Sequence, residues 1–236
     1  MADRWSSAEG HGISARACGA AGWPGPLLGE GLRWSWDRAW QGLGARPSAG
    51  LYERILAAWN EPQRHYHGQQ HLEECLALMD LWRGAAEKPE EMVVALWFHD
   101  AVYEVRASDN EFRSAEWAVH AMQEAGCDRR GVQRVHQMIM ATRHDGVASN
   151  SDQALLLDID LAILGSPPQR FGAYNRAVRA EYSWVPEAVY RGKRREVLES
   201  FLRQDLYHTS AERALLGVQA EENLRGAIAE LSEQGS

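Results

Sequence analysis

The sequence predicts an all-α protein. From about Trp34 onward, apolar residues recur at the three- and four-residue spacing of an amphipathic helix, beginning with Trp36, Trp40 and Leu43. The run ALLLDIDLAILG, residues 154–165, fits a buried strand or a buried helix by its period, and its length and helical neighbours favour a helix. Prolines and glycines interrupt the pattern where helices are expected to end.

The first expected helices run from about Trp34 to Leu43, Leu51 to Trp59, Gly68 to Trp82, Glu90 to Tyr103, and 110 to 125. Pro62 ends the second helix and Gly126 the fifth. The third would place His71 and Cys75 on its apolar face, so the histidine is expected to point inward. The fourth is apolar nearly all round and is therefore expected to be buried.

The second part of the chain predicts four or five further helices. One carries Val132, Val135, Met138 and Ile139 and ends near His144 and Gly146; residues 154–165 form the next; two or three more follow Phe171, are broken at Pro186 and Gly192, and end near Leu231. These last helices would extend a helical bundle at its C-terminal end.

The chain is expected to form one domain with a leader. Residues 1–33 are rich in Gly, Ala, Ser and Pro and show no sustained period, so we expect a disordered or loosely packed segment there. Residues 34–232 would form the helical domain. A chain of 236 residues with 45% hydrophobic residues is long enough to bury a full core.

Composition excludes several classes of function. The formal net charge of −8 opposes a general affinity for nucleic acid or for an anionic membrane. Because no apolar stretch approaches the roughly 20 residues of a membrane span and the N-terminus lacks a signal-peptide core, we expect a cytoplasmic protein. The cysteines Cys18, Cys75 and Cys127 suggest reduced, mostly structural thiols. The sequence leaves homo-oligomerisation open.

Acidic and imidazole side chains occur in the most apolar parts of the chain. His99 and Asp100 directly follow MVVALWF, and an unpaired carboxylate in such surroundings costs several kcal/mol. A lone histidine on an apolar face, such as His71 by itself, is more often a core residue with a hydrogen-bond partner. Taken together, however, the following residues suggest one divalent-metal site: His67, His71, His99, Asp100, His144, Asp158 and Asp160.

In order along the chain, His71, His99-Asp100 and Asp160 resemble the H…HD…D signature of the HD-domain metal-dependent phosphohydrolases. The stretch RHYHGQQHL resembles the Y-H-x-x-x-H element of the cyclic-nucleotide phosphodiesterase branch. Similarity to an uncharacterised bacterial branch covers roughly Trp34 to Leu231, through EPQRHYH, FHDAVYE, DNEFRSAE, ATRHD, DIDLAILG, AVRAEY, VYRGKRREVL and EENL. The resemblance implies an all-α HD-domain bundle with extra C-terminal helices.

The resemblance also implies roles for individual residues. His71, His99, Asp100 and Asp160 would bind the metal ion, with Asp100 part of the catalytic centre, and His67 would be the general acid. The alternative for His67 is a surface residue before a helix. Since residues two apart do not share a helix face, only one aspartate of the pair is expected to bind metal. Asp158 would then support the ligands from behind or act as a structural cap.

Other candidates surround this set. Glu111 lies where related proteins place a glutamate or histidine near the metal-bound water, and the alternative is a solvated acid at a helix start. His144 would contact substrate or a second metal, or would be a loop residue. Arg64 and Arg143, which flank site residues, would bind substrate.

His120 is read as a surface or packing residue. The basic run Arg191, Lys193, Arg194 and Arg195 is read as a solvated face, with a phosphate clamp as the alternative.

These residues favour a metal-dependent phosphohydrolase. Metal-activated water would cleave a phosphoester of a small phosphorylated metabolite, which the family resemblance implies to be a nucleotide, and the donor set is compatible with Mn, Mg, Fe, Co or Zn. One alternative is a di-iron oxygenase of the same superfamily, which usually carries more histidines between the HD pair and the last aspartate. The other is a non-enzymatic helical binding module that keeps the metal for stability.

Overall fold

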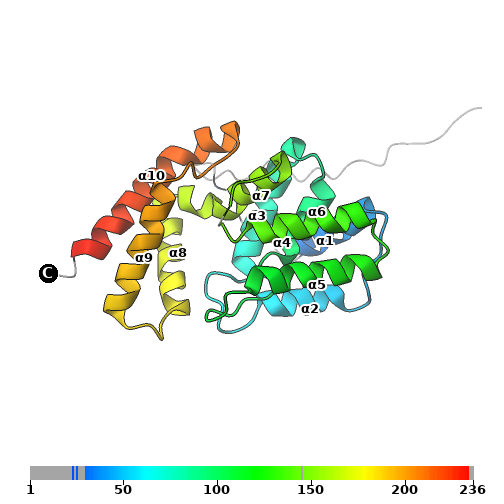
Figure 1. Cartoon of the computed structure of the whole chain (residues 1–236), viewed down its shortest axis with the longest axis horizontal. Coiled ribbons are helices and arrows are strands. Elements are labelled where there is room, and N and C mark those ends of the chain that lie inside the picture. The colour runs from blue at the N-terminus through cyan, green and yellow to red at the C-terminus, as the bar shows by residue number, and fades with distance from the viewer. Residues whose placement is uncertain (1–22, 24, 26–29, 145, 234–236) are drawn as a thin grey trace, which may run out of the picture.

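The structure is a computed structural model, and it describes residues 23, 25, 30–144 and 146–233. These residues form α-helices and two short 3-10 helices, with no strand among them, which confirms the all-α prediction (Figure 1). The α-helices are α1 (Glu30–Gly42), α2 (Leu51–Trp59), α3 (Gln69–Leu81), α4 (Pro89–Phe98), α5 (Asn110–Glu124), α6 (Arg129–Ala141), α7 (Ser151–Asp160), α8 (Pro168–Glu181), α9 (Glu187–Leu202) and α10 (Ser210–Glu233). The 3-10 helices are η1 (Arg83–Ala85) and η2 (Leu161–Gly165).

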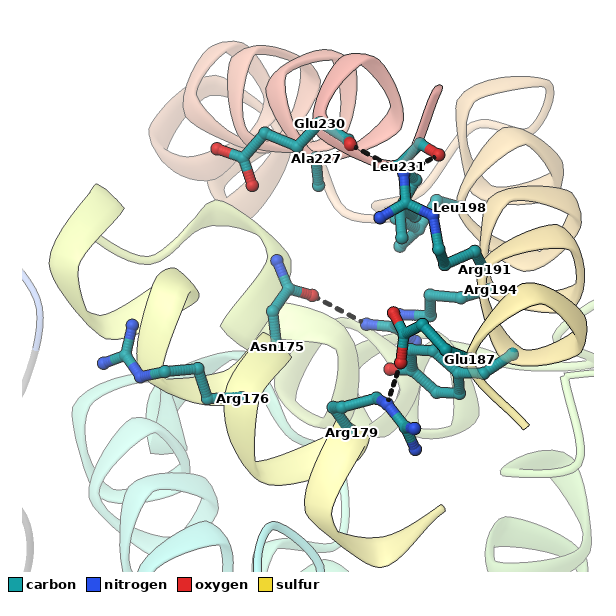
Figure 2. Close-up of a pocket in the computed structure, with 11 residues that line it drawn as sticks. Asn175, Arg176, Arg179, Glu187, Arg191, Arg194, Leu198, Ala227, Glu230 and Leu231 are labelled. Carbon is teal, nitrogen blue, oxygen red and sulfur yellow. Dashed lines mark hydrogen bonds and ion pairs between the residues drawn. The ribbon is translucent and has the colours of Figure 1, made fainter. Parts of the chain in front are cut away.

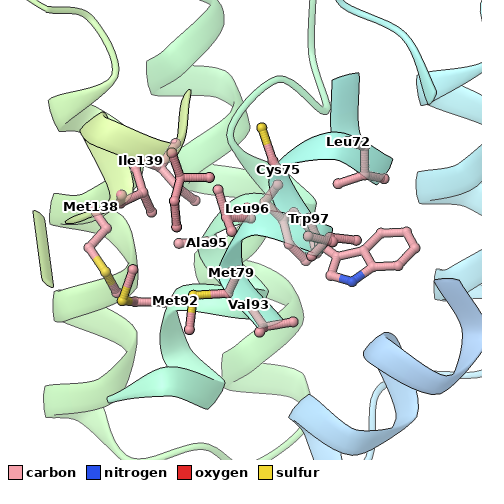
Figure 3. Packing of buried hydrophobic residues seen from close by; sticks show 14 of the residues in the cluster. Leu72, Cys75, Met79, Met92, Val93, Ala95, Leu96, Trp97, Met138 and Ile139 are labelled. Carbon is pink, nitrogen blue, oxygen red and sulfur yellow. The ribbon is translucent and has the colours of Figure 1, made fainter. Parts of the chain in front are cut away.

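Helix α4 is the central element of the core. It contacts α1, α3, α5, α6 and α7, and every side chain from Met92 to Phe98 is buried. Its neighbours contribute Met79 and Ile139, among others, to the same apolar cluster (Figure 3). A helix with apolar residues all round can be stable only when other helices cover every face. The burial predicted for this helix is therefore confirmed, and the residues after its end are held at the centre of the molecule.

The last three helices lie together on one side of the molecule (Figure 1). Helix α10 packs on α9 and on η2, and α8 also contacts η2. The approach of α10 to η2 is close, because a Cβ atom at Gly165 would lie 2.7 Å from the carbonyl oxygen of Leu216. Helix η2 directly follows Asp160, so the C-terminal helices pack next to the site residues at the end of α7.

Two predicted boundaries in the helical region are wrong. The helix expected to reach Tyr103 ends at Phe98, because the backbone N–H of Val102 donates to Ser114 Oγ at 3.0 Å instead of to the carbonyl oxygen of Phe98. That carbonyl oxygen accepts from the N–H of Ala101 at 2.9 Å, which is the tighter spacing of a turn. Gly192 does not break a helix but lies inside α9. A glycine there costs about 1 kcal/mol, which the burial of other α9 side chains outweighs.

The start of the fold also differs from expectation. Helix α1 begins at Glu30, so residues 30–33 of the expected leader are helical and Leu32 is 1% exposed. The rest of the expected leader, apart from residues 23 and 25, lies outside the described residues. Within the described part of the chain, no helix has the length and apolar character that crossing a bilayer requires.

Candidate metal centre

Four side chains from three separate segments meet at the centre of the bundle. His71 lies in the first turn of α3, His99 and Asp100 directly follow α4, and Asp160 is the last residue of α7. His71 and His99 are 2% and 1% exposed, and the Asp100 and Asp160 side chains are 15% and 12% exposed. The structure thus brings together the four residues for which metal binding is predicted.

The spacing of their donor atoms matches the ligand shell of a single ion. His71 Nε2 lies 3.2 Å from both His99 Nε2 and Asp160 Oδ1. His99 Nε2 lies 3.3 Å from Asp100 Oδ2 and 3.5 Å from Asp160 Oδ1. Ligands about 2.1 Å from one metal ion stand about 3.0 to 3.4 Å apart in octahedral or tetrahedral geometry. His71, His99 and Asp160 therefore fit around a divalent cation, and Asp100 Oδ2, at 3.8 Å from His71 Nε2, lies slightly further out.

The tautomer of His99 supports the same conclusion. His99 Nδ1 lies 2.8 Å from the carbonyl oxygen of Leu96, which can only accept, so Nδ1 carries the proton and donates it. When the His99 ring is neutral, its Nε2 atom therefore carries a lone pair, which faces His71 Nε2 and the carboxylates of Asp100 and Asp160. His71 Nδ1 lies 3.2 Å from the Tyr66 hydroxyl, which can hold that ring in a matching orientation. Such a group of acceptors is stabilised by a cation among them.

Cys75 is a further donor that sequence reasoning did not include. Its Sγ lies 3.7 Å from His71 Nδ1, and its donor atom lies within 4.8 Å of those of His71, His99 and Asp160. The signal was available, because Cys75 follows His71 by one helical turn. Burial raises the pKa of the Cys75 thiol well above its usual value. Because a bound metal ion lowers the pKa of a thiol, Cys75 and Asp100 are both candidates for the fourth donor.

The electrostatics of the cluster keep both carboxylates ionised. Burial raises the pKa of Asp100, but the charge and hydrogen bond of His99 outweigh it and hold that pKa below the usual range. Burial likewise opposes ionisation of Asp160, and hydrogen bonds from His144, His71 and His99 bring its pKa well below normal. Burial lowers the pKa of His99, yet the neighbouring carboxylates raise it well above its usual value. Without a metal ion these carboxylates favour a protonated His99, and a bound cation would replace that proton and leave the neutral ring as a ligand.

His67 lies beside the cluster and is held by Glu181. Its Nδ1 lies 2.8 Å from Glu181 Oε2, and the two rings of His67 and Tyr103 are stacked 4.2 Å apart. Glu181 Oε1 accepts hydrogen bonds from three successive backbone N–H groups, those of His65, Tyr66 and His67, at 2.7 to 2.9 Å. Burial lowers the pKa of His67, but the hydrogen bond to Glu181 and the charges of Asp100, Glu181 and Asp160 together outweigh it and the pKa is raised. These surroundings favour the protonated imidazole, which is the form that a general acid requires.

Glu181 and Tyr103 were not among the predicted site residues. The Tyr103 hydroxyl donates a hydrogen bond to Glu181 Oε2 at 3.0 Å. The Glu181 side chain is 0% exposed, so this hydrogen bond helps to compensate for the burial of its charge. The sequence carried one signal for Glu181: it is the last residue of α8, where the helix dipole disfavours a negative charge. Three backbone donors and His67 compensate for that position.

The cluster opens onto a cavity of about 320 Å³. Asp100, Asp160 and His67 line it, as do three other predicted site residues: Glu111, Arg143 and His144. Half-buried Glu111 lies in the first turn of α5, and Arg143 is exposed.

His144 Nε2 lies 3.0 Å from Asp160 Oδ2, the oxygen opposite the one that faces His71. His144 also has a left-handed backbone (φ 53°), an uncommon conformation for a histidine.

Arg64 has a different role from the one predicted, and Asp158 has the second of the two roles predicted for it. The Arg64 side chain is 1% exposed, and its guanidinium is bonded to carbonyl oxygens of the turn after α4, so it positions Asp100 instead of binding substrate. Asp158 is the structural cap, because its carboxylate accepts from the backbone N–H groups of His208 and Thr209 at 2.7 and 2.8 Å. His120 is exposed on α5, as expected.

No protein-family model, curated protein or solved structure matches the chain. The resemblance to HD-domain proteins therefore remains a prediction from the sequence motifs.

Proposed function

We propose that this chain is a metal-dependent phosphohydrolase of the HD-domain type, acting on a small phosphorylated metabolite such as a nucleotide. The observation that carries the proposal is the meeting of four metal donors, from His71, His99, Asp100 and Asp160, two of which (Asp100 and Asp160) line a cavity that His67 also lines. A structural metal needs no such cavity and no oriented acid. A hydrolytic metal needs both.

A divalent ion held by these donors would act as a Lewis acid on a phosphate oxygen and lower the pKa of water. The residues of the chain supply the rest of the chemistry. His67, whose Nδ1 faces Glu181, would donate the proton on Nε2 to the leaving oxygen. Glu181 then stabilises the ring as it loses and regains that proton. Glu111 and His144 line the cavity where they can orient the attacking water and the phosphate.

The cavity supports a compact phosphorylated substrate. Its volume lies at the lower end of the roughly 300 to 1,000 Å³ range of small-molecule pockets. Arg143 adds a positive charge to its wall, and Tyr103 and Tyr182 add aromatic surface. A phosphate group next to Arg143 and His144, with a base or another flat group against the tyrosines, satisfies both kinds of wall.

The test is release of phosphate from nucleoside mono-, di- and triphosphates, cyclic nucleotides and alarmones, with added Mn²⁺. Asp100→Ala is compared with Asp80→Ala, which removes an exposed carboxylate from the far end of α3. We expect metal-dependent release by the wild type and by Asp80→Ala, and a loss of at least about 100-fold in Asp100→Ala. Full turnover in the Asp100→Ala protein would refute the proposal.

A second candidate is a two-metal oxygenase. The observation that favours it is the orientation of Asp160, whose Oδ1 faces His71 and whose Oδ2 faces His144, as a carboxylate between two ions would. Only His144 supplies an added imidazole there among the described residues. Two irons per purified chain with a visible absorbance band would favour the oxygenase, and a colourless Mn²⁺ or Mg²⁺ protein would remove it.

A further inference from the structure

A second cavity, of about 300 Å³, lies between α8, α9 and α10. Asn175 and Arg176 reach it from α8, Arg194 from α9, and Ala227 and Glu230 from α10 (Figure 2). None of the proposed metal ligands lines it. It is therefore a separate site in the molecule, and its chemistry differs from that of the metal cluster.

This cavity is positively charged, although the chain as a whole is acidic. Four arginines and two glutamates line it: Arg176, Arg179, Arg191, Arg194, Glu187 and Glu230. Arg179 Nε and Glu187 form an ion pair at 2.9 Å, and Arg191 donates to the last carbonyl oxygens of α10. The charges of Arg176 and Arg194, with which no described carboxylate pairs, suit a phosphate monoester, which carries about −1.5 to −2 near neutral pH.

Arg194 is the residue whose surroundings are least complete. One terminal nitrogen donates to Asn175 Oδ1 at 3.0 Å, and the guanidinium lies 5.0 Å from the centre of the Tyr174 ring and also hydrogen-bonds to the Tyr174 side chain. Its Nε is buried without a hydrogen-bond partner, and no described carboxylate forms an ion pair with it. A buried cation that lacks both partners is costly in a folded protein, and an anion would supply them.

Further donors lie on α8 beside Arg194. Asn175 uses its oxygen to accept from Arg194, so its amide N–H groups remain as donors, and the described residues offer them no acceptor. Arg176 is exposed and likewise has no hydrogen-bond or ion-pair partner among those residues. Leu198, Ala227 and Leu231 give the cavity an apolar wall. The donors suit an oxyanion, and the wall suits the carbon part of the same molecule.

We propose that the α8–α9–α10 cavity binds a small organic phosphate, with Arg194 and Arg176 contacting the phosphate group and Asn175 donating to it. The site is distinct from the metal centre and goes beyond the hydrolysis proposed there. Tyr174 separates the two, because its ring contacts the Arg194 guanidinium and its side chain also lines the metal cavity. Binding at the two sites must therefore be measured separately.

The experiment is isothermal titration calorimetry of the full chain with inorganic phosphate and with AMP, in EDTA to remove metal. The Asp100→Ala protein is titrated in parallel. We expect saturable binding with the same affinity in the wild type and in Asp100→Ala. The affinity for AMP should exceed that for inorganic phosphate, and Arg194→Gln should bind at least about tenfold more weakly than the wild type. Arg176→Gln should weaken binding about threefold or more, and ligand should raise the thermal midpoint of the wild type but not of Arg194→Gln.

Arg195→Gln is the matched control, because Arg195 is the next residue on α9, pairs with Glu199 at 3.6 Å and does not line the cavity. Its affinity should equal that of the wild type. Wild-type affinity in Arg194→Gln, tighter binding of succinate than of AMP, or no saturable binding by the folded wild type would each overturn the proposal. If circular dichroism finds Arg194→Gln unfolded, Arg176→Gln decides, and unchanged affinity in that variant overturns it.

Discussion

Glu181 determines how His67 is oriented and charged. The carboxylate lies 2.8 Å from His67 Nδ1 and also accepts from the backbone N–H of His67. These hydrogen bonds outweigh the effect of burial and lower the pKa of Glu181 to about 2, so the carboxylate is ionised at any pH at which the protein would work. A fixed negative charge at this position favours protonated His67.

We therefore predict that Glu181→Gln shifts the pH dependence of catalysis. A general acid must be protonated, so activity falls as pH rises through the pKa of His67, which Glu181 raises. Glutamine keeps an oxygen for the backbone donors but removes the charge, so the basic limb of the pH–rate profile should move to lower pH by about one unit or more. Glu196→Gln, on the exposed side of α9, should leave the profile unchanged. An unmoved basic limb in Glu181→Gln would rule out His67 as the acid.

Asp158 connects α7 to the start of α10. Its fully buried carboxylate accepts from the backbone and side chains of His208 and Thr209, the residues directly before α10. This position also places a negative charge at the N-terminal end of that helix, where the dipole favours it. Asp158 lies two residues before Asp160, and the two side chains serve different elements.

Asp158→Ala should therefore destabilise the fold without weakening metal binding directly. Loss of the acceptors for several buried donors is expected to cost about 2 to 4 kcal/mol in the free energy of unfolding, measured with urea. Metal affinity of the folded protein should stay within about threefold of the wild type, whereas Asp160→Ala should abolish it. A loss of metal affinity in folded Asp158→Ala comparable to that of Asp160→Ala would return Asp158 to the metal site.

Alanine substitutions at two glycines separate the effect of close packing on stability from that of helix propensity. A Cβ at Gly165 would lie 2.7 Å from both the Cβ and the carbonyl oxygen of Leu216, so Gly165→Ala must push α10 away from η2. We expect a loss of about 1 to 3 kcal/mol in unfolding free energy. A Cβ at Gly192, inside α9, would meet nothing within 4 Å, so Gly192→Ala should stabilise by about 0.5 to 1 kcal/mol. Equal effects of the two changes in thermal or urea unfolding would contradict this packing.

At the scale of the whole molecule, the metal centre joins three segments of the bundle, from α3, α4 and α7. An ion that binds only the folded chain should raise its stability, by about 2.7 kcal/mol when the free ion is at 100 times its Kd. We predict that Mn²⁺ raises the thermal midpoint of the wild type, that EDTA reverses the rise, and that Asp100→Ala shows neither change. Calorimetry or circular dichroism checks this. A metal-independent midpoint in the wild type would argue against a bound divalent ion.

The fold class and the set of metal donors can be predicted from the amino-acid sequence. The positions of most helices follow from apolar spacing, which depends on residues three and four apart and can be read locally. The resemblance of the ordered histidines and aspartates to the H…HD…D signature singled out His71, His99, Asp100 and Asp160. The helix end at Phe98 and the uninterrupted α9 escaped prediction, since a hydrogen bond to Ser114 and burial against other helices decide them.

Tertiary structure alone decided which distant side chains complete the site. His67 and Glu181 are 114 residues apart in the chain, Arg64 and Asp100 are 36 apart, and Asp158 and His208 are 50 apart. No local period encodes such pairs, because they depend on how finished helices pack against one another. The same holds for Arg194, which looks like one cation in a solvated run until α8 and α10 enclose it. Helix formation is specified by neighbours along the chain, and the environment of a charged group by neighbours in space.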